Sequence, residues 1–250
     1  MNKWSLEETR KLCQIWEKKS RKHILQIFSN RSWQSIRRKS QSIHLSRLRK
    51  YKYDYVRENL SKSFREDMDN WLIGEMLGDG HIDRQGRYCH TCKFKEHLDL
   101  LSGLFAKYNI PVKINKNTYK DKRTNNTYQR YLLRSPSIFQ SARKKWYNNK
   151  KICPYIKLDT TILFHWFLGD GTISKKGSSM KLCTMGFYPN CLNNLVNYCN
   201  DFGLTVKIQK DNNFYIPKLD NNKKIMAKLT DLSWPTCYAY KLERLKMWLN

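Results

Sequence analysis

The stretch that decides the fold is Trp71–Ile82, WLIGEMLGDGHI, which returns further along the chain as Leu163–Ser174, LFHWFLGDGTIS. Both copies place apolar residues at helical spacing ahead of a Gly-Asp-Gly triplet. These apolar residues are Leu72, Ile73, Met76 and Leu77 in the first copy and Leu163, Phe164, Phe167 and Leu168 in the second. The pattern predicts two buried helices, each of which delivers one carboxylate, Asp79 or Asp170, to its C-terminal end.

A carboxylate is an unusual group for the C-terminal end of a helix. Partial negative charge gathers there, so an anion is disfavoured unless a cation lies beside it. A bound divalent metal reverses the sign of the local electrostatics. A plain turn explains one Gly-Asp-Gly triplet, but two copies behind two apolar helices favour a metal-binding function. The next glycines, Gly80 and Gly171, are predicted to take the left-handed conformation that commonly ends a helix.

The two copies belong to longer repeats. Val112-Lys113-Ile114 follows Asp79 at nearly the same interval as Val206-Lys207-Ile208 follows Asp170. Lys151 and Lys241 also stand at nearly equal intervals after the two aspartates. A repeat of this length predicts two pseudo-symmetric halves rather than a solenoid.

The repeated motif resembles the LAGLIDADG homing endonucleases in their single-chain, two-motif form, with the motifs at Leu72–Gly80 and Leu163–Gly171. The phrases HWFLGDG, NNKK before Ile-Cys-Pro, and Tyr-Lys-Leu at Tyr240–Leu242 are similar to the branch that includes the yeast mitochondrial intron-encoded enzyme. The resemblance covers the chain from about Asp67 to its C-terminus. It implies an enzyme of a mobile, intron-homing element.

The resemblance also implies roles for individual residues. Asp79 and Asp170, with Gly78 and Gly169 beside them, are the implied metal site. The implied cofactor is Mg²⁺, with Mn²⁺ as a substitute, since oxygen ligands suit hard cations better than zinc. Lys151 and Lys241 are the implied catalytic lysines, which position water or stabilise charge on the phosphate.

One residue departs from the symmetry of the repeat. His165 stands at a helix-packing position that is Gly74 in the first copy. The departure puts the symmetry of the helix pair in question, but not the two carboxylates. If it disables one half, the alternative is an enzyme that nicks a single strand.

The charge of the chain points to a polyanionic partner. Its 250 residues include 48 Lys and Arg against 21 Asp and Glu, a formal net charge of +27 spread along the sequence. Such a cationic surface is typical of nucleic-acid-binding proteins, and double-stranded DNA is the expected partner. With no run of about 18 apolar residues and no signal-peptide core, we expect a soluble, intracellular protein with no membrane partner. The single-chain, two-motif form implies a monomer. Its Lys, Asn, Ile and Tyr content fits an AT-rich mitochondrial, phage or bacterial genome.

Residues 1–50 are predicted to form a separate domain of three short helices. Ser5 with the acidic residues after it is a helix start, a second helix is expected at His23–Phe28, and a third from Ser32 to about Leu45.

The spacing of Trp, Arg and Ile residues in this domain resembles Myb/SANT-like helix-turn-helix modules. Gln34, Arg37 and Arg38 lie on the basic face of the third helix and are the predicted DNA contacts. A protein-interaction module is the alternative. Residues 51–66 are predicted to be a basic linker that follows the phosphate backbone. A helix, or a plain linker without DNA contacts, is the alternative.

Residues 67–155 and 156–250 are each predicted to fold as αββαββα. The fold class is therefore α+β, two pseudo-symmetric halves with saddle-like antiparallel sheets behind a small three-helix domain. The helices expected after the motifs are Leu98–Tyr108, Ser137–Tyr147, Pro189–Phe202 and Lys223–Leu232.

The strands that follow each motif are expected to carry a basic face. In Arg87–Lys95 the basic residues alternate with apolar ones, and a β-ribbon with a basic face can lie in the DNA major groove. An ordinary half-buried sheet with a solvated face is the alternative. The predicted DNA contacts in the two halves are Arg87, Lys93, Lys95, Lys113, Arg130, Arg134, Lys175, Lys176, Lys181 and Lys207.

The eight cysteines fit reduced thiols better than a disulfide framework, because they are scattered through a long chain. Cys89-His90-Thr91-Cys92 has zinc-like spacing, with His81 nearby. No second Cys-x-x-Cys follows, so zinc at this motif is the less favoured interpretation.

The favoured function is a site-specific endonuclease that cuts both strands of double-stranded DNA at a long target. An RNA maturase, which binds its host intron RNA, and a non-cleaving DNA-binding regulator are the alternatives. Both aspartates and both lysines are present, and binding alone requires none of them.

Overall fold

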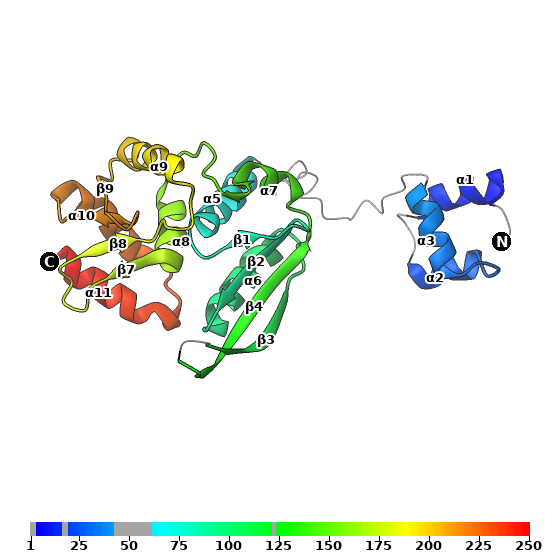
Figure 1. The fold of residues 1–250 in the computed structure, drawn as a ribbon, viewed down its shortest axis with the longest axis horizontal. Coiled ribbons are helices and arrows are strands. Elements are labelled where there is room, and N and C mark those ends of the chain that lie inside the picture. The colour runs from blue at the N-terminus through cyan, green and yellow to red at the C-terminus, as the bar shows by residue number, and fades with distance from the viewer. Residues whose placement is uncertain (1–3, 17–19, 43–61, 122–123) are drawn as a thin grey trace.

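The computed structural model describes residues 4–16, 20–42, 62–121 and 124–250. Two four-stranded antiparallel sheets and the helices around them make up the larger part (Figure 1), so the expected α+β class is confirmed. No helix among the described residues is long and apolar enough to cross a membrane.

The N-terminal part folds as three short helices. They are α1 (Leu6–Ile15), α2 (Arg21–Ile27) and α3 (Trp33–Ser42). Ser5 begins α1 with a capping box, in which its hydroxyl accepts from the Glu8 N–H at 3.0 Å and its own N–H donates to the Glu8 carboxylate at 2.8 Å.

These three helices have a small apolar core of their own. It consists of Leu12, Trp16, Ile24, Phe28 and Ile36. The expected end of the third helix and residues 51–61 of the expected linker lie outside the described residues.

The first half begins with α5, the motif helix, which starts at Lys62, ahead of the expected boundary at Asp67. Its sheet has the order β1-β2-β4-β3, and α6 packs on β2 and β4. A two-stranded hairpin, β5 with β6, follows the last helix. The elements are α5 (Lys62–Leu77), β1 (His81–Ile82), β2 (Arg87–Cys92), α6 (Lys95–Lys107), β3 (Lys113–Lys120), β4 (Thr127–Ser137), α7 (Gln140–Trp146), β5 (Tyr147–Asn148) and β6 (Lys150–Lys151).

The second half repeats this order, with the sheet β7-β8-β10-β9. It ends in one element that the αββαββα prediction lacks, the helix α11, which packs on β7 and α10. The elements are α8 (Thr160–Asp170), β7 (Gly171–Ile173), β8 (Met180–Leu182), α9 (Pro189–Asp201), β9 (Lys207–Ile208), β10 (Phe214–Ile216), α10 (Asp220–Ala227), η1 (Lys228–Asp231), η2 (Thr236–Tyr238) and α11 (Ala239–Leu249).

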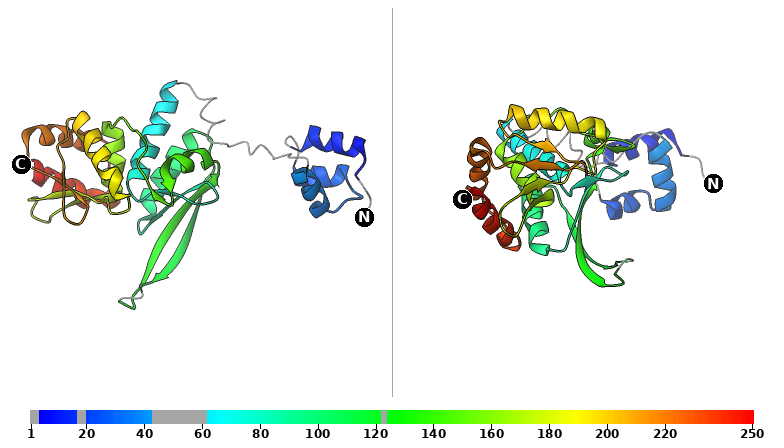
Figure 2. Two further views of the ribbon diagram at one scale, coloured as in Figure 1. Left: turned by 45° about the horizontal axis from the view of Figure 1, so that its top comes forward. Right: turned by 60° about the vertical axis from the view of Figure 1, so that its left-hand side comes forward.

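The two halves differ most in their second strand pair. In the first half, β3 and β4 pair from Lys113 opposite Arg134 out to Lys120 opposite Thr127. In the second half, β9 and β10 pair only at two positions, Ile208 with Phe214 and Lys207 with Tyr215. The long β3–β4 hairpin therefore projects from the body (Figure 2), whereas β9–β10 does not.

The two motif helices, α5 and α8, pack side by side in the middle of the body (Figure 1) and share one continuous apolar core with both sheets. A Cβ atom on Gly74 would lie 2.6 Å from the Cβ atom of His165 and 2.6 Å from the carbonyl oxygen of Ile162. The histidine thus occupies the space that the glycine leaves open. Because the two residues complement each other, the departure at His165 does not separate the helices.

Two expectations about backbone conformation are wrong. Gly80 and Gly171 do not take the left-handed conformation, and the glycines with positive φ are Gly86, Gly177 and Gly203. Gly171 has φ −74° and ψ 134° because β7 begins there. A side chain at Gly171 would collide with Phe167, and one at Gly80 would meet the Glu75 carbonyl oxygen at 2.6 Å. Close packing therefore requires glycine at these positions.

We predict that Gly74→Ala destabilises the protein by about 2 kcal/mol or more, since the added methyl group overlaps the backbone of α8. Thermal unfolding of the full chain measures this change. Gly103→Ala in α6 is the matched control, because a Cβ atom there meets nothing within 4 Å and alanine is the better helix former. Equal melting temperatures for the two variants would contradict the packing account.

Candidate active site and nucleic-acid interface

The two predicted carboxylates lie at the C-terminal ends of the paired motif helices. Asp170 is the last residue of α8, and Asp79 lies two residues beyond Leu77, the last residue of α5. A Cβ atom on Gly169 would lie 2.9 Å from the backbone nitrogen of Asp79 and 3.3 Å from the Cα atom of Gly78. Only glycine permits this approach, and it brings the two Gly-Asp pairs together.

Each helix end also receives the ammonium group of one predicted lysine. The Lys151 Nζ atom donates to the carbonyl oxygens of Gly78 at 3.0 Å and Gly80 at 3.4 Å. The Lys241 Nζ atom donates to the carbonyl oxygens of Leu168 at 2.7 Å and of Phe167 and Gly169 at 3.3 Å each. The two cations therefore offset the partial negative charge of the two helix ends.

The two lysines reach equivalent places from different elements. Lys151 lies on β6 of the short β5–β6 hairpin, whereas Lys241 lies on α11. Lys241 is buried and Lys151 is partly buried. Lys151 and Lys241 are thus equivalent in their position at the helix ends, as their sequence intervals predicted, but they lie in different kinds of secondary structure.

The four groups share one electrostatic environment. Burial, reinforced by the negative charge of Asp79, raises the pKa of Asp170 to about 7. Burial lowers the pKa of Lys151 and of Lys241 to about 8, against the attraction of both aspartates. Two carboxylates next to helix-end carbonyl oxygens form an oxygen donor set that suits a hard divalent cation.

The raised pKa of Asp170 predicts a pH-dependent stability. An unfolded aspartate ionises near 3.8 and the folded one near 7, so the folded state holds the extra proton between these values and loses stability as pH rises through them. Asp170→Asn removes this loss. In the presence of chelator, we expect the variant to melt above the unsubstituted chain by roughly 5 °C at pH 8 and by much less at pH 4. Melting curves that stay parallel between pH 4 and pH 8 would contradict the burial of an ionised carboxylate.

In the first half, three of the predicted DNA contacts line one hollow of about 440 Å³. Lys113 and Arg134 are directly opposite each other on β3 and β4, so their side chains share a face. The hollow is lined by Arg87, Pro111, Lys113, Asn115, Arg134, Ser135 and Pro136. The Arg134 Nε atom is buried and has no hydrogen-bond partner among the described residues.

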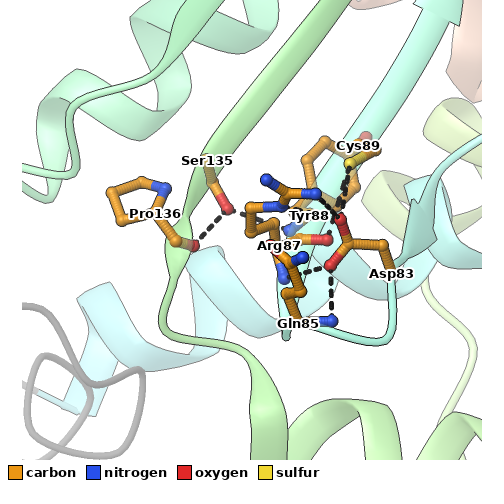
Figure 3. Close-up of polar contacts among 7 residues, drawn as sticks. All are labelled: Asp83, Gln85, Arg87, Tyr88, Cys89, Ser135 and Pro136. Atoms are coloured by element: carbon orange, nitrogen blue, oxygen red, sulfur yellow. Dashed lines mark hydrogen bonds and ion pairs between the residues drawn. The ribbon is translucent and has the colours of Figure 1, made fainter.

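Arg87 is engaged by a turn residue. Its guanidinium contacts the Asp83 carboxylate at 2.5 Å, and Asp83 also accepts from the backbone N–H groups of Gln85 and Arg87 (Figure 3). On the neighbouring residue, the Tyr88 N–H donates to the Ser135 hydroxyl at 2.9 Å. The guanidinium is therefore fixed in place, and a phosphate must compete with Asp83 for it.

The remaining predicted contacts of this half are less uniform. Lys95 is not a strand residue: β2 ends at Cys92 and α6 starts at Lys95, whose ammonium pairs with Asp99 at 2.6 Å. Lys93 follows the strand and lies over the Phe94 ring. The alternation over Arg87–Lys95 was wrong at its end because a helix begins there. Arg130 lies on β4 with its guanidinium 4.3 Å from the centre of the Tyr119 ring.

In the second half, the basic strand residues share one face. Tyr215 on β10 is directly opposite Lys181 on β8 and Lys207 on β9, so the two lysines flank the tyrosine. Lys175 and Lys176 are exposed in the turn between β7 and β8. Both sheets therefore present rows of basic residues, as the sequence predicted.

The α3 helix also presents polar and basic groups. Gln34 and Arg38 line a hollow of about 550 Å³ with Trp4, Arg31 and Lys39. Arg37 is exposed but lies outside that lining. Arg31 is tied to the Glu8 carboxylate at 2.9 Å, so it helps to join α1 to the loop before α3.

Sequence reasoning missed the aromatic residues of the long hairpin. Tyr119 and Tyr128 are directly opposite each other near its tip and are 40% and 48% exposed. Exposed aromatic rings beside cations are typical of nucleic-acid-binding surfaces. The tyrosine Tyr119 stands in the run NTYKDKRTNNT, Asn117–Thr127. This run is polar throughout and therefore predicts a loop, whereas in the structure its two ends continue the paired strands β3 and β4.

Comparison with known proteins identifies relatives in sequence and in fold. The curated protein MJ1098 of Methanocaldococcus jannaschii is 28% identical over 141 residues, which are 54% of this chain and 54% of that protein. The chain thus spans about half the length of this relative. The homing endonuclease I-WcaI bound to its DNA recognition sequence is 21% identical with a TM-score of 0.56, and the match covers 71% of this chain and 85% of that one. I-DmoI in complex with DNA and Mn has a TM-score of 0.42 at 14% identity, covering 65% and 96%.

The I-WcaI likeness confirms the fold of the two halves. A sequence model of the LAGLIDADG DNA endonuclease family matches residues 69–228, a span that contains both Gly-Asp-Gly triplets and Lys151. Because the match extends over more than half of the 250 residues, the chain belongs to the LAGLIDADG DNA endonuclease family.

Proposed function

We propose that the chain is a site-specific endonuclease that hydrolyses both strands of a long double-stranded DNA target with a divalent metal, Mg²⁺ by preference and Mn²⁺ as a substitute. One observation carries the proposal. Two carboxylates, Asp79 and Asp170, meet at the ends of paired helices, and each helix end also holds the ammonium group of a lysine. A protein that only binds DNA or RNA gains nothing from this arrangement, since burial opposes the ionisation of Asp170.

The residues of the site divide the chemistry between them. A bound divalent ion supplies Lewis acidity and lowers the pKa of water at the scissile phosphate. Asp79 and Asp170 hold it through carboxylate oxygens, with the backbone of Gly78 and Gly169 beside them. Lys151 and Lys241 place positive charge where the phosphate gains negative charge in the transition state. Their lowered pKa values also let them exchange a proton near neutral pH.

The two sheets are proposed to read the DNA in the major groove. Their basic rows, which include Lys113 with Arg134 and Lys181 with Lys207, contact phosphates and base edges. Because the β3–β4 hairpin is much longer than β9–β10, the first half reaches further along the duplex. We therefore expect a target in which more base pairs are specified on one side of the cut than on the other.

The N-terminal module is proposed to be a Myb/SANT-like DNA-binding domain that uses Gln34, Arg37 and Arg38. All three are exposed on α3. Linked to the nuclease halves, the module raises the local concentration of the second DNA contact and so increases affinity without changing the cut. The chain is proposed to act as a monomer, since it contains both motifs.

Cleavage selection on a randomised double-stranded DNA library tests the function. The full chain is incubated with Mg²⁺, with Mn²⁺ or with Ca²⁺, and the ends of the cut molecules are sequenced. Cuts on both strands at one asymmetric site support the proposal. Tight binding without cutting in Mg²⁺ and Mn²⁺, or a preference for structured intron RNA, contradicts it and leaves a maturase or a regulator. Cutting of one strand alone leaves a nicking enzyme.

A further inference from the structure

A second cluster of metal-ligating side chains lies buried in the first half, apart from the carboxylates at the helix ends. Glu75 comes from α5, His90 from β2 and His97 from α6. Their exposed fractions are 2%, 1% and 0%. One ligand atom from each lies within 4.8 Å of one from each of the others. Three elements thus bring one carboxylate and two imidazoles to a single point.

The hydrogen bonds inside the cluster leave the histidines unsatisfied. The Glu75 carboxylate makes three contacts: Oε1 lies 2.9 Å from Nδ1 of His165, and Oε2 lies 2.9 Å from Nδ1 of His90 and accepts from the Tyr88 hydroxyl at 2.8 Å. Neither ring nitrogen of His97 has a hydrogen-bond partner within the described residues, and Nε2 of His90 has none of normal geometry there. A buried polar atom without a partner destabilises the fold, so the cluster favours an additional ligand.

The composition of the cluster suits a cation. Two imidazole rings and one carboxylate, all buried, bring nitrogen and oxygen lone pairs to a single point.

We propose that Glu75, His90 and His97 bind a structural zinc ion. Two imidazole nitrogens and one carboxylate oxygen are ligands that zinc accepts, whereas magnesium prefers oxygen ligands only. The partly buried Cys92 sulfur lies two residues along the strand from His90 and 3.7 Å from the Tyr238 hydroxyl; it lies outside the cluster of three and is the proposed fourth ligand. Such an ion joins α5, which leads to Asp79, to β2 and α6.

The ligand set differs from the one that the Cys89-His90-Thr91-Cys92 spacing offered. The Cys89 sulfur lies 3.9 Å from the Asp83 carboxylate and 3.7 Å from the carbonyl oxygen of Arg87. It is thus engaged in the β1–β2 turn and does not join His90. From that motif, His90 and the proposed fourth ligand Cys92 take part, and the other ligands, Glu75 and His97, come from the helices on either side of it in sequence.

The test is the metal content of the full chain without DNA. Protein produced with added zinc is passed through gel filtration in mild chelator and analysed by elemental mass spectrometry, and metal-free protein is titrated with Co²⁺ in a visible spectrometer. We expect about one zinc ion per chain and the ligand-field bands of four-coordinate cobalt. His97→Phe, which keeps the ring volume, is expected to lose most of the metal. His81→Gln, which changes an exposed histidine of the same half, is expected to keep it.

Each outcome decides the proposal. Folded protein that holds less than a tenth of an equivalent of zinc and gives no four-coordinate cobalt spectrum overturns it. Zinc that is retained in His97→Phe but lost in Asp79→Asn with Asp170→Asn also overturns it, since the ion then sits between the helix ends. These measurements need no DNA cleavage, so their failure leaves the proposed endonuclease untouched.

Discussion

Asp79→Asn and Asp170→Asn are each expected to lower the rate of double-strand cleavage by about a thousandfold or more. Each substitution removes a charged oxygen ligand from a site where the two motif helices meet. A metal ion contributes several kcal/mol to the stabilisation of transition-state charge, and about 1.4 kcal/mol corresponds to a factor of ten in rate. The variants should still bind DNA, because the basic rows of the sheets do not involve these carboxylates.

Single-turnover cleavage of the selected duplex, with each strand labelled separately, measures the effect. Binding in Ca²⁺ is measured in parallel. Asp99→Asn is the control: this exposed carboxylate on α6 pairs with Lys95, and its loss should change the cleavage rate less than twofold. A variant at either helix-end aspartate that cuts both strands at the unsubstituted rate would remove that residue from the catalytic site.

Lys151→Met and Lys241→Met are expected to lower the single-turnover rate by about a hundredfold, with a smaller change in DNA affinity. Each methionine keeps most of the side-chain volume but removes the ammonium group from the helix-end carbonyl oxygens. Removal of one preorganised electrostatic group typically costs between about a hundredfold and a thousandfold in rate.

The rate is measured at saturating duplex across pH 6–9. Lys150→Met is the matched control for Lys151, because Lys150 is exposed and its ammonium lies over the Tyr188 ring. Weakened DNA binding at an unchanged saturating rate would show that Lys151 and Lys241 serve binding alone.

The amino-acid sequence predicted the central helices and the pairing of the halves because both are local or repeated patterns. The apolar spacing before each Gly-Asp-Gly triplet gave the helices, and the repeat of Val-Lys-Ile gave the two sheets. The meeting of Lys151 with Gly78 and of Lys241 with Leu168 was available only through family resemblance. One lysine arrives on a hairpin and the other on a helix, so no local pattern marks them as equivalent.

The errors have identifiable physical causes. Gly80 and Gly171 are glycines because Glu75 and Phe167 leave no space for a side chain. In sequence, a glycine required by close packing cannot be distinguished from a glycine required by a positive φ. Lys95 fits a strand alternation that actually ends where α6 begins.

The Glu75 cluster was not predictable, since its three residues come from three elements with no shared spacing. Only the position of His90 inside a Cys-x-x-Cys motif hinted at metal, and that motif contains only part of the proposed ligand set. The complement between Gly74 and His165 likewise appears only when the two motif helices are packed together.

The most direct measurement of the central claim is a crystal structure of the full chain bound to its selected DNA duplex in Ca²⁺. We expect Ca²⁺ to occupy the metal sites without supporting cleavage, so that the duplex stays intact. We predict cation density in contact with the carboxylates of Asp79 and Asp170 and with a phosphate of each strand, and the β3–β4 hairpin in the major groove. Duplex bound away from the two helix ends, or helix ends without a cation at a bound phosphate, would contradict the claim that these paired carboxylates form the nuclease site.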